Sequence, residues 1–325
     1  MKLSIIIPTW NDFDNLKRLL AQIDKMAIFH EAIIVDDASD IDCSPKALGL
    51  VPSRMTCNVI YLRNDHTNGA GYSRNRGIEK VSGDHVIFFD SDDLFTDEFP
   101  LLLDDLEDAT EPYDFCIFKH VDSRARDVGS WAPLEPDVAY WNKAGIWSAL
   151  QELPNKHFST MVQIANYPWN KIYTTAFLIE KKLRCTELMV QNDVELHWLS
   201  FLRAERILVS NRVGCEHFVV DNGIRLTNRN GHERLEIFRA LVAVHKEIKS
   251  KATLDFPFLL AFTRFHVDLI SWINTILNDD MKPKFQQRVR AFLTYALAPE
   301  EFEKIIKADF DVGFKFNEHL GRGLK

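Results

Sequence analysis

The stretch Val86-Ile87-Phe88-Phe89-Asp90-Ser91-Asp92-Asp93 decides the fold of this chain. Its four apolar residues are typical of a buried strand, and the carboxylates follow directly where that strand ends. In open α/β folds, ligands bind beyond the carboxyl ends of the strands. Clustered carboxylates repel one another, and a divalent cation such as Mn²⁺ or Mg²⁺ removes the conflict because it prefers oxygen ligands. The alternative is a solvated turn that caps the next helix.

The Asp-x-Asp spacing at residues 90–92 is not unique in the sequence. The same spacing recurs at Asp12 and Asp14, Asp40 and Asp42, and Asp309 and Asp311. Only the 90–92 copy begins at the end of an apolar run. This context, rather than the spacing itself, indicates a metal site.

The composition is that of an ordinary globular protein, with 325 residues, 46% hydrophobic and 26% charged. This length is enough for an α/β domain and a smaller second unit. A formal net charge of -8 argues against a nucleic-acid partner, because non-specific binding needs a basic surface. The five cysteines include no Cys-x-x-Cys pair. We therefore expect a cytoplasmic protein without a zinc site or a disulfide framework.

No segment is expected to span a membrane. The N-terminal apolar run is broken by Pro8 and is shorter than the core of a signal peptide. The most apolar later stretch, residues 256–277, contains Arg264, His266 and Asp268, which would be costly to bury in lipid. We expect at most a peripheral contact with a membrane.

The first part of the chain alternates short β-rich runs with helical patterns, which predicts a mostly parallel sheet with crossover helices. Strands are expected at residues 3–7, 32–35, 59–62, 85–89 and 115–121, with helices from residue 13 and at 72–81 and 98–109. Later helices are expected at 232–250, 258–278, 284–297 and 300–308. We therefore predict an α/β catalytic domain at 1–225 and a helical C-terminal region at 226–325.

Three segments that are distant in sequence each follow a predicted parallel strand, so all three open on the same edge of the sheet. They are residues 8–11, residues 36–37 and residues 90–93. Asp36 or Asp37 is suited to accept a hydrogen bond from a base N–H or a ribose hydroxyl, as acidic residues after a strand do in dinucleotide folds. The alternative is a pair of Asx turns that support their own loop.

A glycine-containing segment precedes the carboxylate strand. Gly69 and Gly71 let backbone approach a ligand closely, and the helix that starts here offers unpaired N–H groups. Arg74 can add a bidentate contact to a phosphate or a base edge. The alternative is a flexible loop with a solvated arginine.

Four segments, in this order, resemble family 2 glycosyltransferases. They are SIIIPTWN at 4–11, IIVDDASD at 33–40, GYSRNRG at 71–77 and FFDSDD at 88–93. A weaker resemblance continues through PWNKIY at 168–173 and VQNDV at 190–194. The resemblance implies a GT-A fold, a nucleotide-diphosphate sugar donor and inversion at the anomeric carbon.

The resemblance also implies roles for individual residues. It places the nucleotide sugar against Pro8, Thr9, Asp36, Asp37, Arg74, Asp90 and Ser91, and it makes Asp90 and Asp92 the metal ligands. Family members commonly carry a Glu-Asp pair whose Asp is the catalytic base. Asn192-Asp193 stands in that place, so Asp193 is the expected base. The structural alternative for Asp193 is a helix N-cap.

Other residues carry weaker signals. His217 is a candidate for a further metal ligand, with a satisfied core or surface histidine as the alternative. Trp169 is a candidate for stacking on a sugar, with packing as the alternative. Arg225 and Arg229 are candidates for holding diphosphate or acceptor, with a solvated loop as the alternative.

We therefore expect a metal-dependent inverting glycosyltransferase that uses Mn²⁺ or Mg²⁺ and a UDP-sugar. Its acceptor would be a glycan or a lipid-linked molecule in surface polysaccharide or glycolipid assembly, and the C-terminal helices would serve a homodimer. One rival function is a nucleotidyltransferase, but residues 8–11 lack the basic, glycine-rich motif that this activity needs. Another is a non-catalytic nucleotide-sugar-binding subunit, in which Asn192 marks a lost active site.

Overall fold

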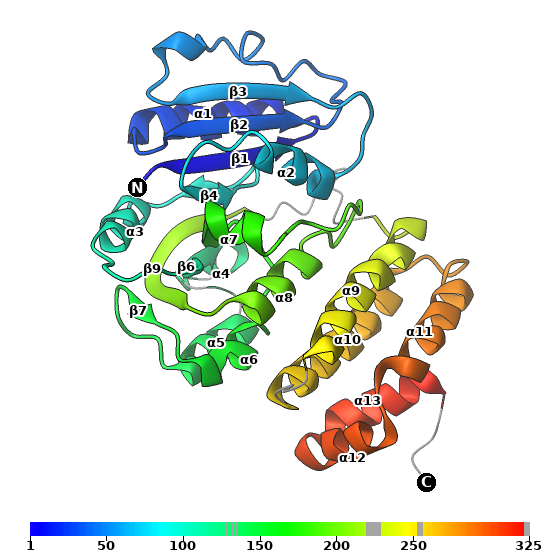
Figure 1. The fold of residues 1–325 in the computed structure, drawn as a ribbon. Helices are drawn as coiled ribbons and strands as arrows, with labels where there is room; N and C mark the ends of the chain where they lie inside the picture. The colour runs from blue at the N-terminus through cyan, green and yellow to red at the C-terminus, as the bar shows by residue number, and fades with distance from the viewer. Residues whose placement is uncertain (128, 132, 134, 219–228, 252–255, 322–325) are drawn as a thin grey trace.

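The protein consists of a nine-stranded sheet flanked by helices, followed by a group of C-terminal helices (Figure 1). The computed structural model describes residues 1–127, 129–131, 133, 135–218, 229–251 and 256–321. The strands are β1 (Leu3–Thr9), β2 (Glu31–Asp36), β3 (Asn58–Arg63), β4 (His85–Phe88), β5 (Leu94–Phe95), β6 (Phe115–Asp122), β7 (Gln151–Glu152), β8 (Lys171–Thr174) and β9 (Ile207–His217).

Helices cover both faces of the sheet and form the C-terminal region (Figure 1). Those of the sheet domain are α1 (Phe13–Met26), α2 (Ala70–Ile78), α3 (Glu98–Glu107), α4 (Ser123–Asp127), α5 (Glu135–Ala144), α6 (Phe158–Met161), α7 (Thr175–Glu180) and α8 (Val194–Arg203). Those of the C-terminal region are α9 (Ile237–Ser250), α10 (Phe256–Ile276), α11 (Lys282–Ala296), α12 (Pro299–Ala308) and α13 (Phe310–Leu320). The helix α13 was not predicted from the sequence.

The sheet is parallel at one end and mixed at the other. Its strand order is β3-β2-β1-β4-β8-β6-β9-β5, and β7 pairs with β9. The first four strands are parallel, as predicted, but β8 runs antiparallel to both β4 and β6. The sheet is mixed because β8 enters between β4 and β6 in the opposite direction, whereas β6 and β9 are again parallel.

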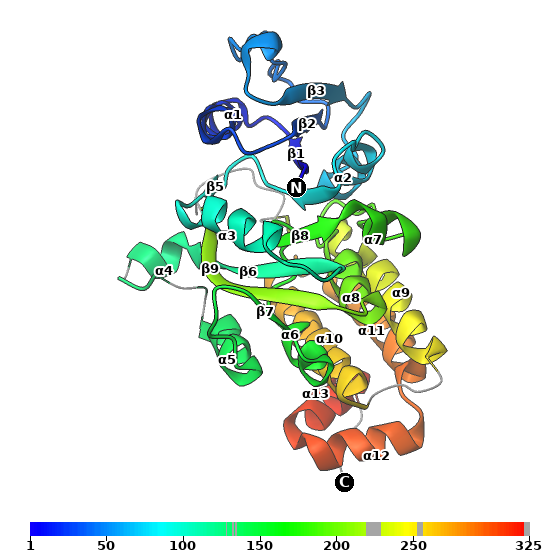
Figure 2. The same ribbon diagram turned by 60° about the vertical axis from the view of Figure 1, so that its left-hand side comes forward.

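The first two strands are buried on both faces. All seven residues of β1 and all six of β2 are buried, which explains their continuous apolar runs. One face of β1 packs on α1 through Ile5 and Ile7, and Ile6 points to the opposite face, where α2 lies. Figure 2 shows α1 and α2 on opposite sides of β1, β2 and β3.

The helix α2 is placed by glycine. A side-chain Cβ at Gly77 would collide with Ile6 of β1, so the missing side chain lets the helix lie directly on the strand. The helix begins at Ala70 and ends at Ile78, three residues before the predicted end. There the N–H groups of Lys80 and Val81 donate to carbonyls only three residues back, which tightens the last turn.

The C-terminal helices share a core with the sheet domain. One cluster of buried apolar side chains runs from Ile6 of β1 through Trp198 of α8 to Leu241 of α9 and Phe262 of α10. The ring of Trp198 packs edge-on against that of Phe262, with centroids 5.1 Å apart. The predicted domain boundary at residues 225/226 lies outside the described residues.

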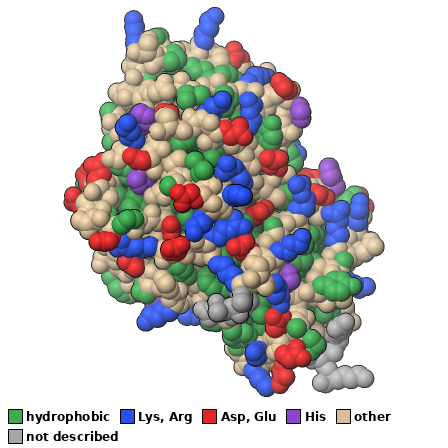
Figure 3. All heavy atoms as spheres, in the orientation of Figure 1, with side chains coloured by type: hydrophobic (Ala, Val, Ile, Leu, Met, Phe, Trp, Pro, Cys, Tyr) green, Lys and Arg blue, Asp and Glu red, His purple; other side chains and the backbone are tan. Residues whose placement is uncertain are grey.

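Among the described residues, α10 alone is long and apolar enough to cross a membrane by length and composition. It packs against α6, α9, α11 and α13. Its charged side chains are paired, with Arg264 2.7 Å from Asp309 and Asp268 2.6 Å from Lys315. One side of α10 is buried, with Phe262, Val267 and Ile270 among its buried residues. On the face seen in Figure 3, basic and acidic side chains are interspersed.

We predict that Gly77→Ala destabilises the protein by about 1–2 kcal/mol, because the added methyl group overpacks the contact with Ile6 by more than the gain in helix propensity. Urea unfolding measures this difference. In an Ile6→Ala background the same change should cost less, since the colliding atoms are gone. Equal costs in both backgrounds would contradict this account of how α2 is placed.

Candidate active site

The three segments predicted to share one edge of the sheet do so. Thr9, at the end of β1, is the register partner of Asp36 at the end of β2. The Asp37 N–H donates to the Thr9 carbonyl at 2.8 Å, and the Phe89 N–H donates to the Ile6 carbonyl at 2.9 Å. The ends of β1, β2 and β4 therefore lie side by side, with the middle strand contributing residues 8–11.

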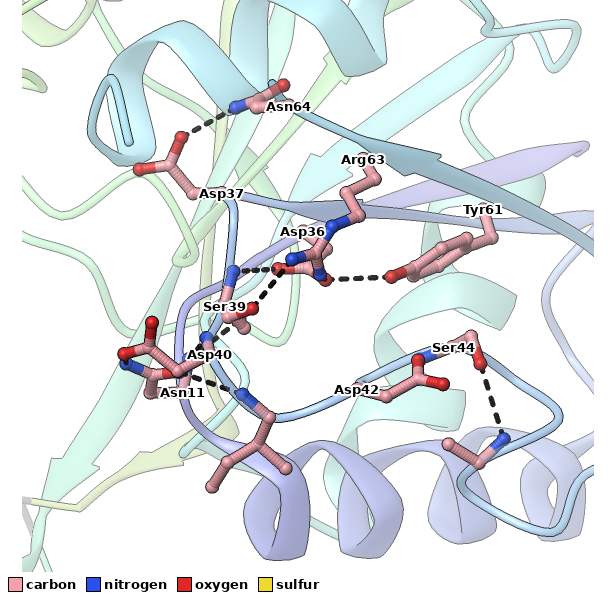
Figure 4. A network of polar contacts seen from close by, with 12 residues as sticks. Asn11, Asp36, Asp37, Ser39, Asp40, Asp42, Ser44, Tyr61, Arg63 and Asn64 are labelled. Atoms are coloured by element: carbon pink, nitrogen blue, oxygen red, sulfur yellow. Dashed lines mark hydrogen bonds and ion pairs between the residues drawn. The ribbon is translucent and has the colours of Figure 1, made fainter. Parts of the chain in front are cut away.

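The side chain of Asp36 fixes the turn after β2 (Figure 4). It is fully buried, and its Oδ2 accepts hydrogen bonds from the Tyr61 hydroxyl at 2.7 Å and from Arg63 Nη1 at 2.5 Å. Its Oδ1 accepts from the Ser39 N–H at 2.9 Å. Asp36 therefore supports its own loop, as in the structural alternative, but through the N–H three residues on rather than through an Asx turn. A contact of Asp36 with a nucleotide stays a prediction.

The neighbouring carboxylate, Asp37, holds the start of α2. Its oxygens accept from the Asn64 amide at 2.6 Å, from the Asn68 N–H at 3.0 Å and from the Gly69 N–H at 2.7 Å. Figure 4 shows Asp37 and Asn64 facing each other. Asp37 thereby links the end of β2 to the glycine-containing segment, and its contact with a nucleotide also stays a prediction.

The carboxylates of Asp90, Asp92 and Asp93 gather after β4. Each offers one ligand oxygen, and these atoms lie within 4.8 Å of one another. Asp93 is fully buried, with its Oδ1 3.0 Å from His217 Nδ1 and 2.9 Å from the Phe218 N–H. Asp90 and Asp92 are partly exposed. Oxygen donors of this kind fit Mn²⁺ or Mg²⁺, and the roles of Asp90 and Asp92 as metal ligands stay predictions.

His217 and Asp93 stabilise each other's charge. Burial raises the pKa of Asp93, and the neighbouring histidine opposes that rise. Burial by itself would lower the pKa of His217, but the Asp93 carboxylate raises it above the usual value. In this structure His217 is a partner of the innermost carboxylate. Its role as a metal ligand stays a prediction.

Sequence reasoning missed two neighbours of the cluster. The Ser91 hydroxyl donates to Asp12 Oδ2 at 2.6 Å, and Arg18 Nη2 donates to the Asp92 carbonyl at 2.6 Å. Asp12 belongs to an Asp-x-Asp pair that lacked a strand directly before it. Asp12 nevertheless follows β1 by only a few residues, at the same edge of the sheet. This position was the sequence signal that could have identified it as a neighbour of the carboxylate cluster.

Arg74 lies between two parts of the site. It is 4% exposed, and its Nη2 lies 2.5 Å from Asp90 Oδ1. Its Nη1 donates to Asn192 Oδ1 at 2.6 Å. Burial opposes the charge on Arg74, but the Asp90 carboxylate keeps the pKa raised. The alternative of a flexible loop with a solvated arginine is therefore excluded.

Asp193 stands at the N-terminus of α8. Its backbone carbonyl accepts from the His197 N–H at 2.9 Å, but its side chain makes no capping hydrogen bond. The side-chain cap that was the structural alternative is therefore not made. Burial raises the pKa of Asp193, and the positive charge of Arg74 partly opposes this. A half-buried carboxyl with a raised pKa is suited to take up a proton.

A buried lysine and an aromatic stack lie below the site. Lys171 is fully buried, with its Nζ 2.5 Å from the Tyr167 carbonyl, and burial lowers its pKa to about 7. Trp169 is 1% exposed and stacks on the rings of Tyr167 and His217 at 4.4 Å and 5.0 Å between centroids. Trp169 is thus a packing residue here.

Arg229 lies 6.0 Å over the Trp10 ring, and Arg225 lies outside the described residues.

Residues 4–164 match the model of glycosyl transferase family 2. The chain carries a family 2 glycosyltransferase domain. An uncharacterized glycosyltransferase of Bacillus subtilis, YwdF, is 36% identical over 97 residues, which are 30% of this chain and 34% of that protein. The poly(ribitol-phosphate) beta-N-acetylglucosaminyltransferase TarS of Staphylococcus aureus is 24% identical over 220 residues, which are 64% of this chain and 34% of that protein.

Solved structures show that the glycosyltransferase domain and the helices after it form a known fold. Residues 1–349 of TarS from S. aureus, in complex with UDP-GlcNAc, match with a TM-score of 0.73 at 18% identity, covering 98% of this chain and 89% of that chain. A mannosyltransferase of Pyrobaculum calidifontis, in complex with GDP-Man and Mn²⁺, matches with a TM-score of 0.54 at 15% identity, covering 98% and 83%. The predicted GT-A fold is confirmed. The sequence matches span about a third of the curated relatives' length.

We predict that Mn²⁺ raises the melting temperature of the protein, because a ligand that binds the native state stabilises it, by about 2.7 kcal/mol at a hundredfold excess over Kd. Differential scanning fluorimetry measures the shift. Asp92→Asn should lose most of it. Asp311→Asn, which changes an exposed carboxylate of another Asp-x-Asp pair, is the matched control and should keep it. An equal shift in wild type and Asp92→Asn would contradict the assigned site.

Proposed function

We propose that this protein transfers a sugar from a nucleotide-diphosphate sugar to an acceptor hydroxyl, with inversion at the anomeric carbon. The observation that carries the proposal is the arrangement around Arg74. The arginine joins Asp90 of the carboxylate cluster to Asn192, and Asp193 follows as a carboxyl with a raised pKa. One arginine thus links a candidate site for the diphosphate, within the residues that match glycosyl transferase family 2, to a candidate base that follows them in the chain.

The donor is proposed to lie along the edge formed by β1, β2 and β4. Thr9 Oγ1 is buried and has no hydrogen-bond partner among the described residues, so a nucleotide would satisfy it. Pro8 precedes it in the same strand, Asp36 ends the neighbouring strand, and Asp37 follows directly. Similar structures in complex with UDP-GlcNAc or GDP-Man support a nucleotide sugar, and TarS, the more similar of the two, supports a UDP-sugar.

The reaction we propose breaks the bond between the anomeric carbon and the diphosphate oxygen and forms a bond to the acceptor oxygen. Asp193 takes the proton of the acceptor hydroxyl on the face opposite the leaving group. Asp90 and Asp92 would hold a divalent cation, which would supply Lewis acidity for the negative charge of the leaving nucleoside diphosphate. Arg74 and His217 keep the protein's own charges near Asp90 and Asp93 balanced.

For the acceptor we propose a polymer or glycolipid of the type assembled at bacterial surfaces. Two relatives carry names that support this choice, a poly(ribitol-phosphate) beta-glucosyltransferase of Bacillus spizizenii and TarS. A non-catalytic binding subunit is the rival reading. The Asp193 side chain makes no capping hydrogen bond at the start of α8, which favours catalysis over a purely structural role.

Asp193→Asn should lower kcat about 10²–10⁴-fold, because the amide cannot accept the acceptor proton. The Kd for UDP in the presence of Mn²⁺ should stay within about threefold of the wild-type value, because Asp193 is not proposed to bind the nucleotide. Sugar transfer from UDP-sugars and isothermal titration calorimetry measure the two quantities. Unchanged transfer by the variant would refute the base, and absence of transfer from every donor by the wild type would refute the proposed activity.

The pH dependence of kcat should carry the signature of Asp193. A base works only when deprotonated, so the rate is lost as pH falls through its pKa. Burial raises that pKa above the ordinary value of about 3.9, so the acidic limb of the profile should lie at a higher pH than for an exposed aspartate. A profile that stays flat down to pH 4 would contradict this.

A further inference from the structure

The segment from Cys185 to Asp193, here called the base segment, is held along the side of α2. The Asn75 side chain grips its first residue, because its amide nitrogen donates to the Cys185 carbonyl and its oxygen accepts from the Cys185 N–H, both at 3.0 Å. Within the segment, the Thr186 N–H donates to the Asn192 carbonyl at 2.9 Å and closes it into a loop. Asp193 therefore takes its position from α2 as well as from α8.

Two glycines let the base segment approach the start of α2. A Cβ added at Gly71 would stand 2.8 Å from Asn192 Cβ, and one added at Gly69 would stand 2.9 Å from the Leu188 carbonyl oxygen. Both distances are shorter than side-chain contacts allow. The glycines that sequence reasoning assigned to ligand approach thus have a second use, which is contact between two parts of the protein.

Arg74 spans this contact with a charged side chain. It donates to Asp90 Oδ1 and Asn192 Oδ1 with its two terminal nitrogens, and both Arg74 and Asn192 are buried. A guanidinium group holds two acceptors in a fixed plane, which an ammonium group does not. With both terminal nitrogens engaged and 4% of the residue exposed, little of Arg74 is open to a nucleotide.

We propose that Arg74 is a positioning residue, which fixes Asp193 relative to the carboxylate cluster by bridging Asp90 and Asn192. The proposal rests on the proposed sugar transfer for its catalytic meaning. In this proposal Asn192 is an uncharged hydrogen-bond acceptor for Arg74. Asp90 is then the carboxylate that pairs with the arginine through one oxygen, and its second oxygen would be available to a cation. Gln191, in the left-handed region at φ 56°, sets the turn just before the bridge.

The test compares Arg74→Lys, Asn192→Leu and the double variant. Each single variant should lower kcat about 30-fold or more while the Kd for UDP with Mn²⁺ changes less than about threefold, because transition-state geometry is lost and ground-state binding is kept. The double variant should be no slower than the slower single one, since both remove the same bridge. Arg206→Lys, which perturbs an ion pair with Glu152 at the opposite end of β9, is the matched control and should keep full activity.

Hydrogen–deuterium exchange supplies a readout that does not depend on transfer. The amides of Thr186 and Leu188 should exchange about tenfold faster in Arg74→Lys and in Asn192→Leu than in the wild type, because local opening of the base segment becomes easier. Exchange in β1 and β2 should not change. If the wild type transfers no sugar, the proposed function fails, but the exchange data still decide whether the bridge exists.

Two results would overturn the proposal. The first is a tenfold or larger rise in the Kd for UDP in Arg74→Lys with exchange of the base segment unchanged, which would make Arg74 a nucleotide ligand. The second is a double variant whose loss equals the product of the two single losses, because independent residues behave in that way. Asn192→Leu keeps the exchange test valid if Arg74→Lys does not fold.

Discussion

Repulsion between carboxylates is the constraint on which the site depends. Asp90, Asp92 and Asp93 lie within 4.8 Å of one another by their ligand atoms, and Asp193 adds its own repulsion to Asp90. Each of the inner carboxylates has a cationic neighbour of its own. Arg74 bonds Asp90, and His217 bonds Asp93. A divalent cation, which prefers oxygen ligands, would relieve the repulsion that remains among the three carboxylates.

A chain of hydrogen bonds links the end of β2, the helix α2 and the start of α8. Asp37 fixes the Gly69 N–H, α2 starts there, and Arg74 extends from its second turn to Asn192. None of these contacts requires a loop to close. The site is preformed on strands and helices whose own positions are set by the buried core, a condition that favours precise placement of reacting groups.

Local patterns predicted the strands well, and long-range contacts set the limit of the prediction. Runs such as Leu3–Thr9 can be recognised as strands from the sequence, because a strand buried on both faces is mostly apolar along its length. The sheet edge followed from the parallel order of β1, β2 and β4. The bond from Arg74 to Asn192 spans 118 positions and that from His217 to Asp93 spans 124, so no local window contains either. The position of β8 between β4 and β6, antiparallel to both, could not be predicted from the sequence for the same reason.

That place of β8 has a consequence for how the chain is made. In the sheet, β6 pairs only with β8 and β9, and both are synthesised after it. At about 5–20 residues per second, several seconds pass between the emergence of Asp122 from the ribosome and that of Lys171. During this time the apolar strand Phe115–Asp122 has no partner on either edge. The nascent chain therefore exposes both edges of a strand that is buried in the finished protein except at Lys119, and such an unpaired strand is prone to aggregate until β8 and β9 are made.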